Sequence, residues 1–395
     1  MLKISVKLLL AASILSSATA SAFSADRVLK VGWVTELSGP WRFIGMSCLD
    51  AAQMAEKEVN AKGKRIELII QDNQTNPATA ATVTRQLDTQ NKVDILSGPT
   101  NADTSLAVYG YAEENKIPLL VPVAAFPRLT RPGTRYTFRI EPDAVGWGYA
   151  LIKLIKETKP NAKVAFMFND FAVNKATLAG LKYQAGKEGM QVVAEVMFPQ
   201  TATDATVQAA QMRATRPDII ILSGGGGAFD ATLMTQLMDV GFTPDQLWHP
   251  TGTVSSVLAW GPRAKGAYYG TFFDHNLPDL TIQGKKFVDE FRAVKGRPPG
   301  YIENYCYVTV HLLAQLPNID AEGSELRQKL RDAMSAIDTT EITTPLPIRF
   351  DKNGARIEYL YLMQTTDITK SDYTSTKKGY LEWSPEALPV YDLAQ

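Results

Sequence analysis

Residues 28–60 read VLKVGWVTELSGPWRFIGMSCLDAAQMAEKEVN, a segment that joins a strand-like run to a helical run through a tight turn. β-Branched and aromatic side chains dominate VLKVGWV and predict a strand. Ser38-Gly39-Pro40 has the residue types of a turn, and Cys48 to Asn60 is rich in Ala, Met and Glu, which favours a helix. If this unit recurs, the chain has the alternation of strands and helices that is typical of parallel α/β sheets.

The unit recurs in two series. The first contains the strand-like runs VLKVGWV, RIELIIQD, KVDILSG and IPLLVPV, with helical patterns between them. After YTFRIEPD the pattern begins again with a helix over Ala144 to Glu157 and the runs AKVAFMF, MQVVAEVMF and DIIILSG. Beyond AYYGTFFDHN three helical patterns follow, over residues 283–294, 301–316 and 324–337, and the tail carries the runs LPIRF and RIEYLYLMQ.

We therefore predict an α/β fold with two doubly wound, Rossmann-like lobes. Lobe 1 comprises residues 26–142 and 273–350, and lobe 2 comprises residues 143–272 and 351–395. Open α/β sheets bind ligands beyond the carboxyl ends of their strands. Two such sheets that face one another predict a binding cleft between the lobes.

The amino-terminal residues have the pattern of an export signal. Lys3 and Lys7 precede a short apolar run from Leu8 to Leu15, and small residues follow it. This order predicts a signal peptide over residues 1–22 that is removed from the mature chain. No cysteine follows the apolar run, which argues against a lipid anchor, and no later stretch approaches the roughly 20 apolar residues of a membrane-spanning helix. The mature protein is expected to be soluble and exported, and the family resemblance described below implies a periplasmic location.

The overall charge is balanced, with 41 basic and 41 acidic residues. A chain without bulk charge has no general attraction to nucleic acid, so we expect no nucleic-acid partner. The only cysteines, Cys48 and Cys306, are far apart and have no metal-like spacing. They are compatible with a disulfide in an oxidising compartment and equally with two unpaired buried thiols.

Motifs for catalysis are missing. The three histidines lie outside any HExxH pattern, and no Gly-x-Ser-x-Gly sequence occurs. The four glycines of ILSGGGGAFD lack the Lys-Ser/Thr of a phosphate loop and the downstream acidic residue of a dinucleotide site. We therefore expect a binding protein that is not an enzyme and that has no cofactor and no metal.

The predicted strand ends supply candidate ligand-binding residues. Small residues would let a ligand approach the backbone, helix starts could bind an anion, and the aromatic pair behind the Ser-Gly-Pro turn would add apolar surface. The simpler interpretations stay open: Asn101 and Asp103 could merely cap a helix, and the aromatic side chains could pack on a lobe surface. The candidates are Trp41, Arg42, Phe43, Ile44, Asn101, Ala102, Asp103, Ala124, Ala125, Phe126, Phe171, Val173, Gly225, Gly226 and Thr251.

An ordered set of motifs resembles a known family. VGWVTELSGP, LIIQDNQTNPATA, ILSGP, IPLLVP, RIEPD, VAFMFNDFA, PDIIILSG and PPGYIENYCYVTVHLLAQL together resemble the type I periplasmic solute-binding proteins of ABC importers, in the branched-chain amino-acid-binding group. The resemblance covers nearly the whole mature chain. It implies two lobes joined by three crossings, which close over a small-molecule ligand and present it to the membrane subunits of an ABC permease. We expect a monomer.

The amino-acid-binding residues of that family are replaced at several positions. Its carboxylate-binding hydroxyl groups would fall near Ala102 and Ala125, and its ammonium-binding acidic residue would fall at Thr251. The aromatic residue that follows the strand-end Asp falls at Val173, with Asn174 where the family has Gly. Because a buried ammonium group needs a paired anion, these changes argue against an ordinary α-amino acid as the ligand.

The resemblance also assigns a role to the aromatic pair. The loop after Ser-Gly-Pro would overhang the cleft, so that Trp41, Phe43 and Ile44 form an apolar lid, while Arg42 pairs with an anion or points to water. We therefore predict a ligand that is a small organic acid with an apolar or aromatic body. The alternative is a branched-chain amino acid or an amide, with the acidic group supplied by Asp103, Asp170 or Asp230. An exported enzyme is a more remote third class.

Overall fold

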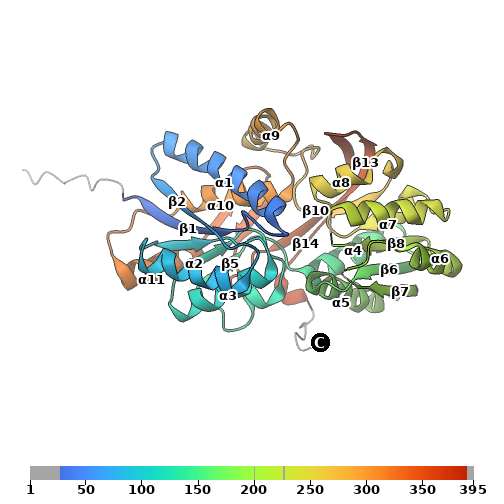
Figure 1. Cartoon of the computed structure of the whole chain (residues 1–395), viewed down its shortest axis with the longest axis horizontal. Coiled ribbons are helices and arrows are strands. Elements are labelled where there is room, and N and C mark those ends of the chain that lie inside the picture. Colours follow the sequence, from blue (N-terminus) through green and yellow to red (C-terminus); the bar gives the residue numbers. More distant parts are fainter. Residues whose placement is uncertain (1–26, 200, 226, 389–395) are drawn as a thin grey trace, which may run out of the picture.

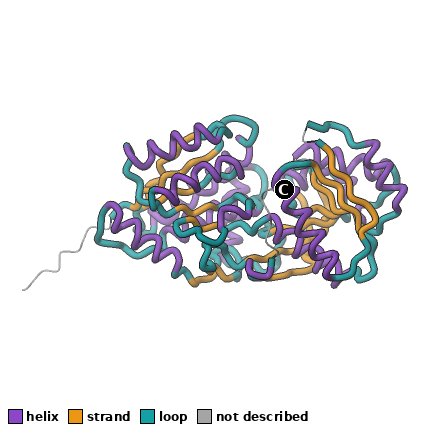
Figure 2. The backbone as a smooth tube through the Cα atoms, turned by 90° about the horizontal axis from the view of Figure 1, so that it is seen from below, coloured by secondary structure: helices purple, strands orange, loops and turns teal. Residues whose placement is uncertain are grey.

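The computed structural model describes residues 27–388 except residues 200 and 226. The predicted signal peptide and Gly226 therefore lie outside the described residues. Two lobes lie side by side, each built on its own sheet (Figure 1). In both lobes helices flank the strands on either side (Figure 2). The fold class predicted from the sequence is confirmed.

The first sheet has the order β2-β1-β3-β4-β5, and all its neighbouring strands are parallel. Its strand order reverses between β1 and β3, which is the position where open α/β sheets bind ligands. Its strands are β1 (Leu29–Thr35), β2 (Ile66–Asp72), β3 (Ile95–Ser97), β4 (Leu119–Val121) and β5 (Thr137–Arg139). Its connecting helices are α1 (Arg42–Ala61), α2 (Pro77–Thr89) and α3 (Ala102–Glu114).

The second sheet has the order β14-β13-β10-β9-β8-β6-β7. Its parallel part reverses between β6 and β8, so the two lobes repeat the same arrangement. The parallel strands are β6 (Val164–Asn169), β7 (Val192–Phe198), β8 (Ile219–Ser223), β9 (Leu247–His249) and β10 (Tyr268–Thr271). The helices of this part are α4 (Ala144–Thr158), α5 (Ala172–Lys187), α6 (Thr206–Thr215), α7 (Gly227–Asp239) and α8 (Val254–Trp260).

A carboxyl-terminal hairpin extends the second sheet. Strand β13 (Glu358–Ile368) pairs antiparallel with β10, and β14 (Tyr373–Trp383) pairs antiparallel with β13. The sequence pattern indicated β13 but missed β14, because many positions of β14 are exposed and carry Thr, Lys and Glu in place of apolar residues. The second sheet is consequently mixed, whereas the first is parallel.

The chain passes between the two sheets three times: after β5, after β10 and before β13. Between the last two passages lie α9 (Ile282–Lys295), α10 (Tyr301–Leu313), α11 (Gly323–Ser335) and a small hairpin of β11 (Asp338–Thr340) and β12 (Pro347–Arg349). Helix α10 packs along α1 of the first lobe. The exact residue boundaries of the two lobes stay a prediction. Short 3-10 turns cover Pro127–Thr130, Pro244–Gln246, Pro262–Ala264 and Pro385–Ala387.

Helix α1 begins earlier than its sequence pattern indicated. It starts at Arg42, directly behind the turn, and not near Cys48. A Cβ atom on Gly45 would lie 2.2 Å from the Glu36 carbonyl oxygen, so the glycine allows the first turn of the helix to approach the end of β1. The prediction that a loop follows Ser-Gly-Pro and overhangs the cleft is therefore wrong, because Arg42 and Phe43 belong to a helix.

A disulfide bond joins the two helices that pack together in the first lobe. Cys48 of α1 is bonded to Cys306 of α10, with their Cα atoms 5.3 Å apart and both side chains fully buried. Of the two possibilities that the sequence left open, the disulfide is the one present. It covalently fixes α10, which follows a crossing between the lobes, to the lobe that contains α1.

Candidate functional site

A cavity of about 280 Å³ lies between the lobes, at the carboxyl ends of the strands of both sheets. The first lobe contributes the starts of α1 and α3 and the segment after β4, and the second contributes the segments after β6, β8 and β9. The predicted residues that line it are Trp41, Phe43, Ile44, Asn101, Ala102, Asp103, Ala124, Ala125, Phe171, Val173, Gly225 and Thr251.

Two predicted residues are separate from this group. Arg42 is exposed and Phe126 is half-buried, and neither lines the cavity. Arg42 is the first residue of α1, and its side chain faces solvent. Gly226 lies outside the described residues. Which of the lining residues contact a ligand stays a prediction.

Half of the residues that line the cavity are absent from the predicted set, although several of them lie at the predicted strand ends. Helices α8 and α10 reach the cavity from segments without a recognisable strand-end pattern, and Glu141 and Trp147 lie at the first crossing. The motif RIEPD, which contains Glu141, was the available signal, since it marks the point where the chain leaves the first lobe. The additional residues are Thr100, Val123, Glu141, Trp147, Ala172, Asn174, Ser223, His249, Thr253, Ser256, Tyr301 and Ile302.

The buried Glu36 carboxylate holds the first-lobe wall together. It accepts hydrogen bonds from the Thr100 hydroxyl group (2.6 Å), the Thr104 hydroxyl group (2.7 Å) and the Asn73 amide (2.8 Å). These bonds tie the end of β1 to the segment after β3. The Thr100 hydroxyl group is thereby committed to Glu36 within the protein.

Asn101 acts as the cap of α3. Its side-chain oxygen accepts hydrogen bonds from the backbone N–H groups of Asp103 (3.0 Å) and Thr104 (3.3 Å). These two amides are therefore already bound by a protein group, and Asn101 caps the helix. Whether Asn101 and Asp103 also contact a ligand stays a prediction. The Asp103 carboxylate is exposed at the edge of the cavity.

On the opposite wall, α5 begins without a side-chain cap. Phe171 precedes the helix, and Ala172, Val173 and Asn174 form its first turn. The Asn174 amide donates to the Asn169 side chain (2.5 Å) and to the Ser223 carbonyl group (3.2 Å), which joins the ends of β6 and β8. The amino end of this helix offers backbone N–H groups and the positive end of the helix dipole to the cavity.

Gly225 has a specific steric role beside Phe171. Its φ angle is +88°, and an added Cβ atom would lie 2.6 Å from the Phe171 ring. A larger residue would therefore be strained in its backbone and would displace the ring. Gly225 thus allows the Phe171 ring to lie against the backbone at the cavity, which is a role distinct from phosphate binding.

His249 is held in one orientation behind the cavity. Its Nδ1 atom accepts a hydrogen bond from the Thr251 backbone N–H group (3.2 Å), so Nε2 carries the proton and donates to the Asp230 carboxylate (3.1 Å). Asp230 also accepts from the Gly224 N–H group (2.6 Å). Asp230 is thus engaged within the protein, which weakens the alternative in which it binds an ammonium group.

Tyr301 and Thr251 place hydroxyl groups at the same end of the cavity. Both side chains line the cavity and both are largely buried. Burial, reinforced by the charge of Glu141, raises the pKa of the Tyr301 hydroxyl group well above its ordinary value. Tyr301 therefore remains a neutral hydrogen-bonding group at any physiological pH.

Glu141 is the buried carboxyl group of the cavity. Burial raises its pKa to about 8, although the Arg139 guanidinium and the Ala124 backbone N–H group both favour its charged form. It therefore carries a proton at neutral pH, and a protonated carboxyl group can donate a hydrogen bond. The cavity thus contains a neutral donor at a position where the formal charges would suggest an anion.

Arg139 is shared among several carboxyl groups at the crossings. Its guanidinium lies 3.3 Å from the Glu358 carboxylate and 3.8 Å from the Asp143 carboxylate, and it also donates to the Glu141 carbonyl group. A single cation cannot compensate three buried acids fully. Burial consequently raises the pKa of Asp143, and burial together with the charge of Asp143 raises the pKa of Glu358 to about 8.

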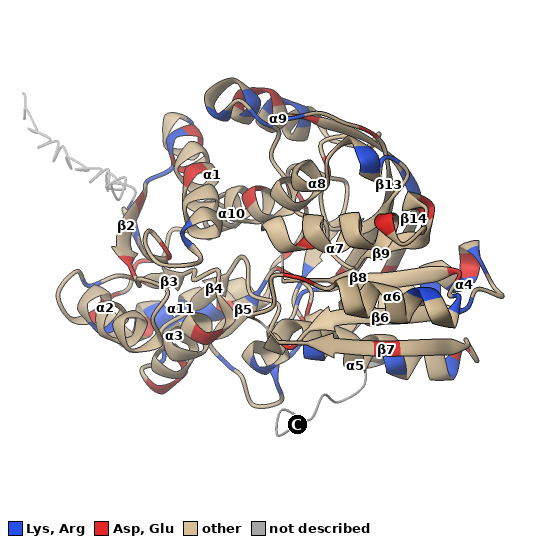
Figure 3. Ribbon diagram, turned by 45° about the vertical axis from the view of Figure 1, so that its right-hand side comes forward, with Lys and Arg blue, Asp and Glu red and all other residues tan. Residues whose placement is uncertain are grey.

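The cavity lacks permanent positive charge. Among the described residues that line it there is no Lys or Arg, and its acidic residues are Asp103 and Glu141. Along the ribbon, Lys and Arg positions are interspersed with Asp and Glu positions in both lobes (Figure 3). Within residues 27–388, excluding 200 and 226, no group of three or more His, Cys, Asp or Glu side chains could hold a metal ion.

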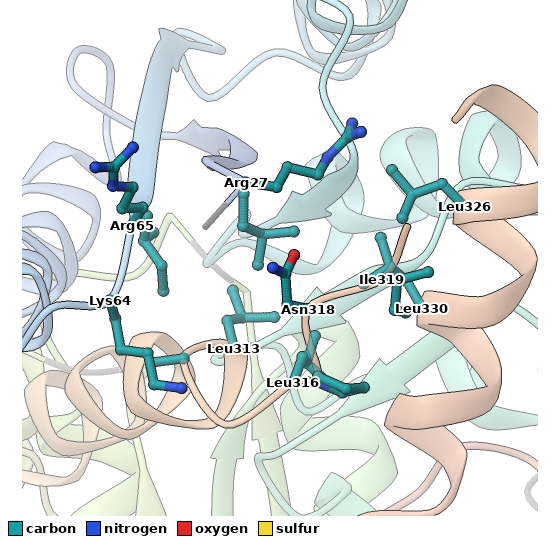
Figure 4. A pocket seen from close by; sticks show the side chains of 13 residues that line it. Arg27, Lys64, Arg65, Leu313, Leu316, Asn318, Ile319, Leu326 and Leu330 are labelled. Carbon is teal, nitrogen blue, oxygen red and sulfur yellow. The ribbon is translucent and has the colours of Figure 1, made fainter. Parts of the chain in front are cut away.

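A second, smaller cavity lies elsewhere in the first lobe. It has a volume of about 90 Å³ and lies at the amino ends of β1 and β2, beside Lys64 and Arg65. Because ligands of open α/β sheets bind at the carboxyl ends of strands, this position is the wrong end of the sheet. Figure 4 shows the apolar side chains around it: Leu313, Leu316, Ile319, Leu326 and Leu330.

Comparisons with known proteins agree on one family. A family model described as periplasmic binding protein matches residues 28–372. A curated relative, the Leu/Ile/Val-binding protein homolog 7 of Brucella abortus, is 21% identical over 360 residues, which are 85% of this chain and 88% of the relative. In the described part of the chain no helix is both long and apolar enough to cross a membrane.

Solved structures share the fold. The ABC transporter substrate-binding protein of Sphaerobacter thermophilus has a TM-score of 0.80 and 21% identity, with 90% of this chain and 98% of that chain covered. A solute-binding protein of an ABC transporter from R. palustris, solved in complex with benzoate, has a TM-score of 0.77 and 19% identity, with 92% and 99% covered. At such identities the likeness establishes the two-lobed fold.

Proposed function

Because this chain belongs to the periplasmic binding protein family, we propose that it captures a small organic acid with an apolar or aromatic body and delivers it to an ABC permease. The proteins of this family are non-enzymatic solute-binding components of ABC transporters, located outside the cytoplasm. We further propose that the mature protein is periplasmic and monomeric, and that the predicted residues lining the inter-lobe cavity form the binding site.

The aromatic lining of the cavity is the observation that carries this proposal. Trp41 and Phe43 stack on one another with ring centroids 6.4 Å apart, and Phe171 contributes from the opposite lobe. Trp147 and Tyr301 complete the set from the crossings. Burial of a ring against such surface contributes about 25 cal/mol per Å². A volume of about 280 Å³ is close to the smaller ligand pockets of proteins and suits a molecule with one or two rings.

Neutral donors would hold the carboxylate of such a ligand. The protonated Glu141 side chain can donate one hydrogen bond, and the uncapped N–H groups at the start of α5 can donate others. Hydrogen bonds to a charged acceptor are about twice as strong as bonds between neutral groups. A carboxylate can therefore bind here without an ion pair, provided that Glu141 keeps its proton.

The second candidate is an amino acid or an amide. The Brucella relative is named as a Leu/Ile/Val-binding protein, whereas the R. palustris structure contains benzoate. In this chain an ammonium group would have to bind Asp103, which is exposed, or Glu141 in its ionised form. Ionisation of Glu141 costs free energy at neutral pH because its pKa lies near 8. This cost favours the organic acid.

A thermal-shift panel tests the proposal directly. Benzoate, phenylacetate, phenylpropanoate and cyclohexanecarboxylate are compared with leucine, isoleucine, valine and their amides. Ligand linkage predicts that the aromatic and alicyclic acids raise Tm most. Trp41→Ala should reduce that rise, whereas Tyr183→Ala, at an exposed aromatic residue of α5 that does not line the cavity, should leave it unchanged. A largest shift with leucine, isoleucine or valine, and none with the acids, would favour the second candidate.

A further inference from the structure

A third cavity, with a volume of about 260 Å³, borders the inter-lobe cavity. It lies between the start of α1, the start of α8 and the segment that leads into α10. The two cavities are therefore neighbours that share one wall. The residues that line both are Phe43, Ile44, Thr253, Tyr301 and Ile302.

This third cavity differs from the inter-lobe cavity in its polarity. Besides the shared wall it is lined by Ser47, Ser255, Arg297 and Glu303. Among the described residues that line either cavity, Arg297 is the only Lys or Arg. We refer to this space as the Arg297 compartment. It contains a guanidinium group, paired with the Glu303 carboxylate, whose remaining N–H groups can donate to an anionic group. The described residues that line the inter-lobe cavity include no such group.

The guanidinium is held in place by a buried carboxylate. Arg297 Nη2 donates to Glu303 (2.7 Å) and to the Ser47 hydroxyl group (2.5 Å), and Nη1 donates to the Pro298 carbonyl group (3.0 Å). The side chain of Arg297 remains 30% exposed, while that of Glu303 is 7% exposed. The cation is therefore fixed in position and still accessible from the compartment.

The hydrogen-bonding capacity of the Glu303 carboxylate is used by groups of the protein itself. It accepts hydrogen bonds from Arg297, from Ser47 and from the Gly300 backbone N–H group (2.8 Å). An arginine side chain has five N–H donors, and the bonds within the described residues use three of those of Arg297. Two donors remain, the Nε–H group and one N–H group of Nη1. They point to different sides of the guanidinium, so a ligand carboxylate can accept a single charge-assisted hydrogen bond from either of them.

We propose that the Arg297 compartment is a second subsite, which binds a carboxylate at the far end of an elongated ligand whose apolar body occupies the inter-lobe cavity. The class of ligand is then a dicarboxylic acid with an aromatic or aliphatic body. This inference rests on the proposed function, because the first carboxylate and the body are bound as described above. Phe43 lies in the shared wall with 53% of its surface exposed.

Calorimetry with matched ligand pairs tests this subsite. Phenylacetate and phenylpropanoate are each compared with the analogue that carries a second carboxylate at the para position and with the neutral para-carboxamide. The second carboxylate should tighten binding about tenfold, as a charge-assisted bond does. The neutral amide should gain less, because it lacks the charge that pairs with the guanidinium.

Two variants separate charge from space. Arg297→Gln should remove the preference for the diacid while affinity for the monoacid stays within about twofold. Ser255→Trp fills the compartment from an exposed position while Arg297 and Glu303 are both retained, and should likewise abolish the preference. Arg263→Gln, at an exposed Arg–Asp pair remote from both cavities, is the control and should retain it.

The outcomes distinguish the two levels of the proposal. The subsite is supported if the unmodified protein prefers the diacid and both Arg297→Gln and Ser255→Trp abolish that preference. Equal affinity for monoacid and diacid, or a preference that survives Ser255→Trp, overturns the subsite and leaves the proposed function intact. Absence of binding by every acid, with amino acids bound instead, overturns both.

Discussion

Glu141 provides the sharpest prediction, because its proton is expected to decide whether a carboxylate binds. The carboxyl group lines the inter-lobe cavity and has a pKa of about 8. At pH 7 about nine molecules in ten carry the proton, and at pH 9 about one in ten does. If the protonated form is the one that binds, affinity for an organic acid is nearly constant below pH 7 and falls about tenfold between pH 7 and pH 9.

The substitution Glu141→Gln isolates this effect. Glutamine keeps an N–H donor of similar size and has no proton to lose, so the affinity should become independent of pH over the same range. Isothermal titration calorimetry at pH 6, 7, 8 and 9, with the acid that gives the largest thermal shift, measures both proteins. The ligand carboxylate is ionised throughout this range, so its own titration adds nothing.

A control and a contrary result complete the experiment. Glu188→Gln changes a carboxylate at the far end of α5, which does not line the cavity, and should leave the pH profile of the unmodified protein intact. The reasoning is refuted if the affinity of the unmodified protein is flat between pH 6 and pH 9. It is equally refuted if Glu141→Gln retains the tenfold loss.

Three further predictions concern the framework around the site. Gly225→Val should abolish ligand binding in calorimetry while circular dichroism stays native, because an added Cβ atom lies 2.6 Å from the Phe171 ring; unchanged affinity would contradict this. Replacement of Cys48 and Cys306 by serine should cost about 2–5 kcal/mol in urea unfolding, since the bond closes a loop of 258 residues; an unchanged midpoint would contradict it. Burial and the charge of a neighbouring acid raise the pKa of Glu358 to about 8. The folded protein therefore holds the proton more tightly than the unfolded chain does, so the stabilising contribution of Glu358 is complete below about pH 4.5 and is lost as pH rises through about 8. Glu358→Gln should therefore flatten the decline of Tm over that interval, and an unaltered slope would show that other groups cause it.

The sequence determined the fold class by its periodicity. Strand-like runs that alternate with helical stretches leave few arrangements other than parallel α/β sheets, and the restart after RIEPD indicated a second lobe. The positions of strand ends then located one set of cavity-lining residues, such as Ala102, Ala125 and Thr251, because parallel strands all end at the same edge of a sheet.

Tertiary structure alone decided the rest. Tyr301 and Ile302 come from a helix that follows a crossing, so their place in the cavity depends on how the lobes pack and has no local signal. The disulfide required two helices 258 residues apart in sequence to lie in contact. The protonation of Glu141 likewise depends on the tertiary structure. The sequence specifies only a carboxyl group. Its burial, beside an Arg139 guanidinium that also pairs with Glu358, raises its pKa and makes the group a neutral donor at pH 7.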